Sequence, residues 1–259
     1  MWKEFRIAVS FLTRLPLPYK GEWDERSFSR SSVFFPLVGL IIGFLTALTA
    51  AVFRLTGQTM LAAVAALVTA VVVSGGIHLD GFMDMCDGVF ASRGRERALE
   101  IMKDSRVGSF AVLGVVMLML LKCALYCAVL PERWFFTAIL AAFVFSRFMM
   151  VYCILGFPSA RETGLGATVK KYVSKPALLW GLLLFLLLCL WHGFYPLLIA
   201  LALAFLVMYA AAAGISRFLH GLTGDIYGAI AELSEAVFLL FLVLTVSVLG
   251  GLGLPTALF

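Results

Sequence analysis

The sequence predicts an all-α fold: a polytopic integral membrane helical bundle of about seven spans, some of them candidate re-entrant segments, preceded by an interfacial helix. Two observations predict it. First, 63% of the 259 residues are hydrophobic and only 14% are charged, whereas soluble domains are closer to half apolar, so the surplus must face lipid. Second, several runs of about 20 residues carry almost no charge, and this is the length that crosses a hydrocarbon core.

The N-terminal segment is expected to form the interfacial helix. In MWKEFRIAVSFLTRLPLP, four apolar residues fall roughly on one stripe of a helix: Trp2, Phe5, Val9 and Leu12. A helix with one apolar stripe is typical of the membrane interface, and Pro16 and Pro18 are expected to end it. The segment is not typical of a signal peptide, because Arg14 interrupts its short apolar run and no small-residue cleavage site follows.

Seven charge-poor segments predict the membrane spans, each near the length that a bilayer requires. They cover residues 33–53, 60–77, 107–130, 134–155, 177–192, 195–214 and 236–254. No separate soluble domain, repeat or low-complexity tract is apparent, so residues 1–259 are predicted to form a single membrane-embedded domain. Gly39 and Gly43 form a GxxxG pattern, which permits close packing of a span against another helix.

The distribution of charge predicts the orientation. Only four of the 20 Lys and Arg residues lie within spans or in the turns on the far side: Arg54, Lys122, Arg133 and Arg147. The others lie on the side of the N-terminus, which the positive-inside rule assigns to the cytoplasm. The net charge of +5 therefore reflects topology, and no nucleic-acid partner is indicated. Arg147, inside a span, requires a carboxylate or phosphate partner.

The segment GGIHLDGFMDMCDGVFASRGRERALEIMKDSR, residues 75–106, gathers charge beside apolar spans. Asp80, Asp84 and Asp87 are four and three residues apart, which places them within a sector of roughly 60° on a helix. Three carboxylates on one stripe repel each other unless a cation neutralises them, and hard oxygen ligands suit magnesium, manganese or calcium. The alternative is a solvated polar face of an interfacial helix. Gly81 and Gly88 indicate a kinked or re-entrant path.

Candidates for proton transfer and phosphate binding flank this stripe. His78 could act as a base or donate to a phosphate, and the alternative is a hydrogen-bonded structural histidine. Five cations follow the aspartates: Arg93, Arg95, Arg97, Lys103 and Arg106. Such cations beside a metal site indicate a phosphate-rich substrate. Lys103 and Arg106, which flank Asp104 and Ser105, are the favoured ligands, and some of the others serve topology instead.

A second acidic cluster lies in HGLTGDIYGAIAELSEAVFLL, residues 220–240. Asp225, Glu232 and Glu235 share one helical face directly before the last predicted span, so they are expected at the cytoplasmic edge. The glycine-rich opening around Thr223 could hold a phosphate at a helix N-terminus, or Thr223 or Asp225 could simply cap the helix. The loop PSARETGLGATVKKYVSK, residues 158–175, could cover a nucleotide or be a flexible positively charged connection.

Six segments carry a resemblance to known proteins: SFLTRLPLP, FFPLVGLIIG, GGIHLDGFMDMCDG, RERALEIMKDSRVGSFAVLG, ARETGLGATVK and GLTGDIYGAIAELSEAVFLL. In this order they resemble the cobalamin synthase family, whose members are adenosylcobinamide-GDP ribazoletransferases, over about residues 10 to 245. The resemblance implies a multi-pass transferase in the plasma membrane of a prokaryote, with its site on the cytoplasmic side and a requirement for magnesium.

The resemblance also implies the reaction. Adenosylcobinamide-GDP would react with α-ribazole, or its 5′-phosphate, to give adenosylcobalamin, or its phosphate, and GMP. The expected step is metal-assisted phosphoryl transfer to the ribose 5′-hydroxyl. The implied partners are these two substrates and the lipid bilayer, while a homo-oligomer and contacts with other cobamide-assembly enzymes stay open.

The motifs and the resemblance together assign a role to each candidate residue. The magnesium ion is assigned to three carboxylates: Asp80, Asp84 and Asp87. Asp104 would complete that site or act as the base. The pyrophosphate of the substrate is assigned to Lys103, Ser105 and Arg106, and Arg93 is a further substrate-binding candidate. A second metal or the ribazole hydroxyl is assigned to the distal cluster: Asp225, Glu232 and Glu235.

A polytopic transporter with a cation site on the cytoplasmic side is the alternative function. It predicts ionisable residues near the bilayer midplane and inverted repeats. Here the carboxylates are expected to gather on one face of the membrane, and no repeat is seen in the sequence. The pattern therefore favours the enzyme.

Overall fold

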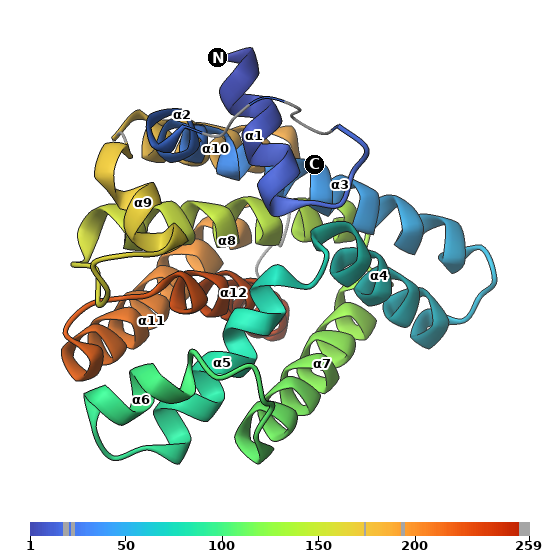
Figure 1. Ribbon diagram of the computed structural model, residues 1–259. Helices are drawn as coiled ribbons and strands as arrows, with labels where there is room; N and C mark the ends of the chain where they lie inside the picture. The colour runs from blue at the N-terminus through green and yellow to red at the C-terminus, as the bar shows by residue number, and fades with distance from the viewer. Residues whose placement is uncertain (18–20, 22–23, 174, 193–194, 254–259) are drawn as a thin grey trace.

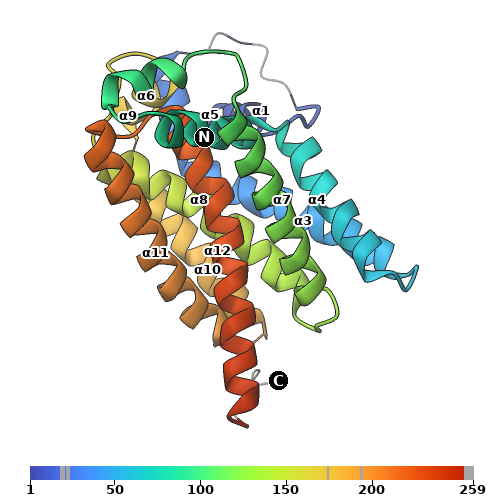
Figure 2. The same cartoon turned by 90° about the horizontal axis from the view of Figure 1, so that it is seen from below.

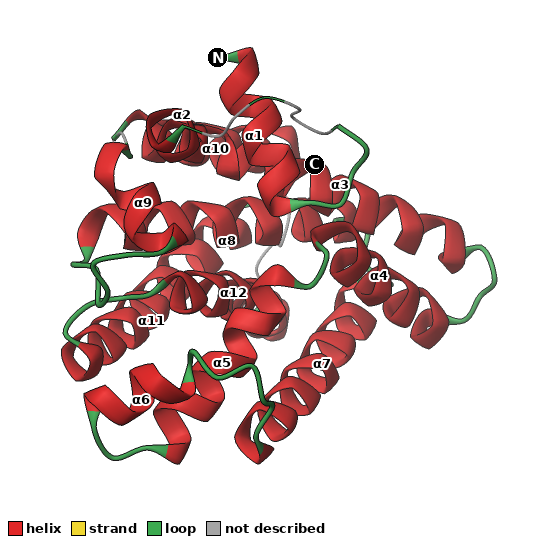
Figure 3. Cartoon of the chain, viewed as in Figure 1, coloured by secondary structure: helices red, strands yellow, loops and turns green. Residues whose placement is uncertain are grey.

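The protein is built from helices, as Figures 1 and 3 show. The computed structural model describes residues 1–17, 21, 24–173, 175–192 and 195–253. Within these ranges, β-type pairing is confined to one isolated parallel bridge, between Ser159 and Leu222. The predicted all-α class is therefore confirmed. The predictions that fall on Pro18, Lys20, residues 193–194 of the turn between the fifth and sixth spans, and residue 254 lie outside the described residues.

Each predicted span corresponds to one long helix. These helices are α3 (Phe35–Arg54), α4 (Thr59–Ser74), α7 (Ser109–Val129), α8 (Phe135–Gly156), α10 (Pro176–His192), α11 (Pro196–Leu219) and α12 (Gly224–Gly251). Five helical segments of the described chain are long and apolar enough to cross a membrane alone. The number of candidate spans rises to seven if the bent pairs α4–α5 and α9–α10 each count as one span. The polytopic membrane bundle is thus confirmed.

The last span starts earlier than predicted. The sequence suggested residue 236, but α12 begins at Gly224, directly after Thr223. The Thr223 hydroxyl caps the helix by accepting a hydrogen bond from the Ile226 backbone N–H at 3.3 Å, as expected of a threonine at this position. The acidic residues after Thr223 are therefore part of the spanning helix.

The described residues also form a 3-10 turn, Ser32–Phe34, and five shorter α-helices: α1 (Trp2–Leu12), α2 (Glu25–Ser31), α5 (Ile77–Ala91), α6 (Arg95–Ile101) and α9 (Leu165–Tyr172). Figure 2 shows α1, α5, α6 and α9 gathered at one end of the bundle, from which the long helices run to the other end. The cation-rich segments thus meet at a single end, as the charge pattern predicted. Arg54 lies at the opposite end, where its guanidinium carbon is 4.4 Å from the centroid of the Phe135 ring.

The predicted N-terminal helix is confirmed as α1. Its Ile7, Ala8 and Leu12 side chains are buried against the bundle, whereas Trp2 is largely exposed. The helix ends at Leu12, before the first of the prolines.

The chain turns by 92° between α4 and α5, so α5 lies across the end of the bundle and does not itself run along the spans. Gly75 and Gly76 make this turn with φ of 67° and 71°, a left-handed conformation that favours glycine. A bend was predicted here, but at Gly81 and Gly88. These two lie inside the uninterrupted helix α5.

Gly81 instead permits a close helix crossing. A Cβ atom there would lie 2.7 Å from the carbonyl oxygen of Asp225 in α12. On α12 itself, a Cβ at Gly228 would lie 3.1 Å from the Cα of His78. The absence of side chains at these two positions lets α5 rest directly on the first turns of α12. This crossing sets the position of the acidic residues on both helices.

Helix α8 is the centre of the bundle, and the GxxxG pattern seats α3 against it. A Cβ at Gly43 would lie 3.1 Å from the Cα of Leu140, and one at Gly39 would overlap the carbonyl oxygen of Phe143. The predicted close packing is confirmed as a contact within the chain.

Replacing Gly39 by alanine is expected to destabilise the protein by about 1–3 kcal/mol, the typical cost of overpacking, and to lower its thermal unfolding midpoint in detergent. Gly214→Ala in α11 is the matched control, because a Cβ there would meet no atom within 4 Å. This control should match or exceed wild type, since alanine favours helix by about 1 kcal/mol. Equal midpoints for both variants would contradict the close contact.

Candidate active site

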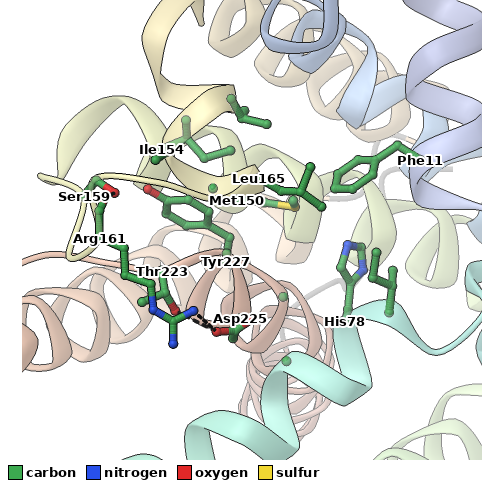
Figure 4. A pocket seen from close by; sticks show the side chains of 18 of the residues that line it. Phe11, His78, Met150, Ile154, Ser159, Arg161, Leu165, Thr223, Asp225 and Tyr227 are labelled. Atoms are coloured by element: carbon green, nitrogen blue, oxygen red, sulfur yellow. Dashed lines mark hydrogen bonds and ion pairs between the residues drawn. The ribbon is translucent and has the colours of Figure 1, made fainter. Parts of the chain in front are cut away.

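A pocket of about 250 Å³ lies where α5, α12 and the connection from α8 to α9 meet. Its walls come from most of residues 77–81 of α5, of residues 159–169 and of residues 223–228 at the start of α12, with side chains from α1 and α8. Figure 4 shows the side chains that line it. Two motifs that are separate in the sequence, ARETGLG and GLTGD, thus form one site.

Backbone contacts hold these two motifs together. The Ala160 N–H donates to the Leu222 carbonyl oxygen, and the Leu222 N–H donates to the Pro158 carbonyl oxygen, both at 2.9 Å. Gly221 has φ of 139°, and a Cβ on it would lie 2.6 Å from the Ala160 nitrogen. A Cβ on Gly166 would lie 2.6 Å from the Gly224 nitrogen. Glycine is therefore required at both positions for the loops to pack this closely.

An ion pair bridges the two motifs inside the pocket. The Arg161 Nη1 lies 3.2 Å from Asp225 Oδ2, and its Nη2 donates to the Leu99 carbonyl oxygen at 3.4 Å. Arg95 supports the same loops from outside, because its guanidinium donates to the carbonyl oxygens of Leu219 at 2.9 Å and Ala160 at 3.3 Å. Arg95 is thus a structural cation. Arg161 was noted in the sequence only as part of a loop.

The aspartate stripe divides between two tasks. Asp80 lines the pocket. Asp84 is half-buried, and burial, followed by the charges of Asp225 and Asp80, raises its pKa to about 6. Asp87 instead caps α7: its two carboxylate oxygens accept the backbone N–H of Gly108 at 2.6 Å and of Ala111 at 2.9 Å.

The described residues contain no group of three or more His, Cys, Asp or Glu side chains close enough to hold a metal ion. Among the carboxylates, Asp225 and Asp80 raise the pKa of Asp84 most and Asp87 less, so α12 contributes an acidic residue near the predicted cluster. The helical spacing of the three stripe aspartates is as expected. Their partners differ because α7 begins beside Asp87.

The loop between α6 and α7 lies apart from the pocket. Lys103, Ser105 and Arg106 are exposed, and none of them lines the pocket. Arg106 Nη2 lies 2.5 Å from Asp104 Oδ2, and this hydrogen bond lowers the pKa of Asp104 to about 2. Arg93 is also exposed. The bond from Gly108 to Asp87 places this loop beside the C-terminal half of α5.

Glu232 and Glu235 do not lie at the cytoplasmic edge as predicted. They sit about two and three helical turns inside α12 and are buried. The Lys122 Nζ of α7 lies 2.5 Å from Glu232 and 2.7 Å from Glu235, and Arg147 of α8 pairs with Glu235. The carboxylate partner required by Arg147 is thereby confirmed. The two glutamates are occupied by this network, away from the pocket.

Two buried polar side chains of the pocket lack a partner. His78 is 3% exposed and Tyr227 is 2% exposed, and within the described chain neither ring nitrogen of His78 nor the Tyr227 hydroxyl has a hydrogen bond. No hydrogen bond within the described chain supports the alternative of a hydrogen-bonded structural histidine for His78. Tyr227 escaped sequence reasoning because a tyrosine in an apolar helix resembles ordinary core. Buried polar groups usually have a partner, so each unpaired one calls for an explanation, and the position of these two in the pocket wall favours a ligand.

Comparison with known proteins gives the family. A family model described as "Cobalamin-5-phosphate synthase" matches residues 4–243. The chain belongs to the cobalamin-5-phosphate synthase family. It is 37% identical to the adenosylcobinamide-GDP ribazoletransferase of Desulforamulus reducens, over 94% of this chain and 97% of that protein. It is 38% identical to the enzyme of the same name from Desulfitobacterium hafniense, over 90% and 94%.

A third relative, the adenosylcobinamide-GDP ribazoletransferase of a Roseiflexus species, is 39% identical over 92% of this chain and 88% of its own. No solved structure matches. As a cobalamin-5-phosphate synthase family member, the protein is a membrane-embedded transferase of cobalamin biosynthesis. The predicted family and the enzyme interpretation are confirmed, and the transporter alternative gains no support.

Proposed function

We propose that this enzyme transfers the phosphoryl-linked cobinamide of adenosylcobinamide-GDP to α-ribazole or its 5′-phosphate, and that it releases GMP. One observation carries the assignment of the site. Asp80, Arg161 and Asp225 come from three distant segments and converge on one pocket, at the end of the bundle where the cations gather. The protein would lie in the plasma membrane of a prokaryote, and the positive-inside rule would place this end of the bundle on the cytoplasmic side.

The attacking group needs one correction. The family is named for a cobalamin 5-phosphate, and an oxygen that carries a phosphate in the product is not the oxygen that attacked. The nucleophile is therefore a secondary hydroxyl of the ribose rather than the predicted 5′-hydroxyl. Its oxygen would bond to the phosphorus next to cobinamide, while the bond from that phosphorus to the bridging oxygen breaks. GMP leaves with the electron pair, and the hydroxyl proton passes to a base.

His78 is the better candidate for that base. Its imidazole lines the pocket and has no partner among the described residues, and burial keeps its pKa well below 6.5, so it is neutral and able to accept a proton. Asp104, the other candidate, lies outside the pocket in an exposed loop, where its hydrogen bond with Arg106 lowers its pKa to about 2.

The carboxylates on α5 fit a magnesium ion. Magnesium is usually held by one or two carboxylates together with substrate phosphates, and it keeps several waters. Asp80 and Asp84 would supply hard oxygen ligands, with Asp225 nearby, since burial and then the charges of Asp225 and Asp80 raise the pKa of Asp84. When bound, the ion would neutralise charge on the pyrophosphate. Asp87 would contribute indirectly, by fixing α7 beside this stripe.

The remaining cations would meet the part of the donor that extends beyond the pocket. Asp80 and Asp87 are about 10 Å apart along α5, at 1.5 Å per residue. Since the loop of Lys103, Ser105 and Arg106 lies beside the Asp87 end, a long substrate anchored at Asp80 could reach it. Arg93, exposed just after α5, would lie on the same path.

Release of GMP tests the function. Purified protein in lipid should release GMP from adenosylcobinamide-GDP only when both magnesium and ribazole, or its 5′-phosphate, are present. Release without any ribazole would show a hydrolase instead. Absence of release with all components would remove the proposal.

Conversion of Asp84 or Asp87 to asparagine should separate metal binding from folding. Asp84→Asn is expected to raise the magnesium concentration for half-maximal GMP release by about tenfold or more, because it removes a hard anionic ligand. Asp87→Asn is expected to lower stability by about 1 kcal/mol, the usual worth of a helix cap, with a smaller change in the magnesium curve. Magnesium titrations and thermal unfolding of both variants check this. The reverse pattern would assign the ion to Asp87.

A further inference from the structure

The pocket has two chemically different sides, and this difference indicates which substrate it holds. Figure 4 shows Arg161, Thr223 and Asp225 close together on one side. Phe11, Met150 and Leu165 lie together on another side. A molecule that matches this pocket has one apolar, flat end and one hydroxyl-bearing or charged end.

The size of the pocket narrows the choice further. At about 250 Å³ it is smaller than the 300–1,000 Å³ typical of pockets for drug-sized ligands, so it cannot enclose a corrinoid. It can hold a nucleoside. On the proposed function, on which this inference rests, two parts of the substrates qualify: the guanosine of the donor and the ribazole acceptor.

Hydrogen-bonding capacity separates these two. Guanine presents several donors and acceptors along its edges, and each one left unpaired in a buried site costs about 1–3 kcal/mol. Phe11, Met150 and Leu165 offer it no hydrogen-bond donor, and the His78 imidazole, which Figure 4 shows on the side of Phe11, could pair with only one of these groups. The benzimidazole-type base of ribazole has hydrocarbon edges and a single free ring nitrogen, so its burial would leave far fewer hydrogen-bonding groups unpaired and would cost less free energy.

We infer that this pocket is the acceptor subsite, which selects an aromatic nucleoside with an apolar base. The base packs against Phe11, Met150 and Leu165. Two buried groups that lack partners flank the nucleoside: the Tyr227 hydroxyl on the side of Ser159 and the His78 imidazole on the side of Phe11. This placement brings the ribose hydroxyls next to Asp225 and Arg161 and leaves the guanosine of the donor outside the pocket.

The inference predicts that pocket variants change the affinity for one substrate only. Leu165→Phe fills the apolar side, and it should raise KM for ribazole by about tenfold while KM for adenosylcobinamide-GDP stays within about twofold. Tyr227→Phe should raise KM for ribazole by about fivefold through the loss of one hydrogen bond. Leu179→Phe on the exposed face of α10 is the matched control and should leave both values unchanged.

Equilibrium binding of ribazole to the protein in nanodiscs, without donor, gives a second measurement that does not require turnover. Wild type and Leu179→Phe should bind ribazole, and Leu165→Phe should bind it about tenfold more weakly. A rise in KM for the donor alone would reassign the pocket to guanosine. Unchanged binding and KM in both pocket variants would overturn the inference, whereas failure of wild type to release GMP despite normal ribazole binding would overturn only the proposed function. Ribazole 5′-phosphate is measured in parallel, and a selective effect of Arg161→Gln on this form would place the phosphate at Arg161.

Discussion

Replacing Arg161 by glutamine is expected to lower kcat/KM for GMP release by about 10²–10³. Arg161 carries the only permanent positive charge among the described side chains of the pocket. It lies 3.2 Å from Asp225, beside the place where a transferring phosphoryl group would develop charge. A fixed cation can raise the rate by this factor because it stabilises the developing charge without having to reorganise during the reaction.

Arg97→Gln is the matched control for this prediction. Arg97 lies on α6 at the same end of the bundle, but it is largely exposed and forms an ion pair with the exposed Glu100, at 3.1 Å. Its loss should leave kcat/KM within about twofold, as surface ion pairs contribute little. Full activity of Arg161→Gln, in protein that unfolds at the wild-type temperature, would remove the pocket from the reaction. Arg161→Lys should recover only part of the activity, since lysine lacks the planar fork.

The spans could be predicted from the sequence because lipid imposes a local rule. A helix must hydrogen-bond its own backbone and present apolar side chains over about 20 residues, and both requirements are visible in any window of the chain. The start of α12 could not be set in the same way. The sequence suggested that the span begins after Glu232 and Glu235, because charged side chains are costly in lipid. Their charge is in fact matched by Lys122 and Arg147, which lie about 90 to 110 residues earlier in the sequence.

Only part of the site could be predicted from the sequence, for a related reason. Helical spacing correctly put Asp80, Asp84 and Asp87 on one face of α5, but spacing gives no information about what faces them. The backbone at the start of α7 donates a hydrogen bond to Asp87, and α12 places Asp225 near Asp80 and Asp84. The pairing of Ala160 with Leu222 is likewise a long-range contact that no local motif specifies. The glycines of both loops were the available signal, because they mark where backbones approach closely.

The buried ion-pair network should dominate stability. Replacing Lys122 by methionine is expected to lower the free energy of unfolding by about 3–5 kcal/mol, because it leaves Glu232 as an uncompensated charge inside the bundle. Lys122 joins α7 to α12 through Glu232 and Glu235, and Arg147 adds α8 to the same network. Since α12 also carries Asp225 and Gly228, loss of this network should also loosen the crossing with α5 that forms the pocket. Unfolding in mixed detergent micelles measures the change.

A second substitution tests whether charge balance, rather than packing, causes that loss. Lys122→Met combined with Glu232→Gln keeps the Arg147–Glu235 pair and restores neutrality, so the double variant should be more stable than Lys122→Met alone. Lys171 and Glu25 form the matched exposed pair, 2.8 Å apart, and Lys171→Met there should cost no more than about 1 kcal/mol. If Lys122→Met costs as little as Lys171→Met, or if Glu232→Gln adds to the damage, the network does not hold the spans together. If the double variant regains stability and also GMP release, the same charges that make α7, α8 and α12 cohere in lipid also keep Asp225 in place against α5.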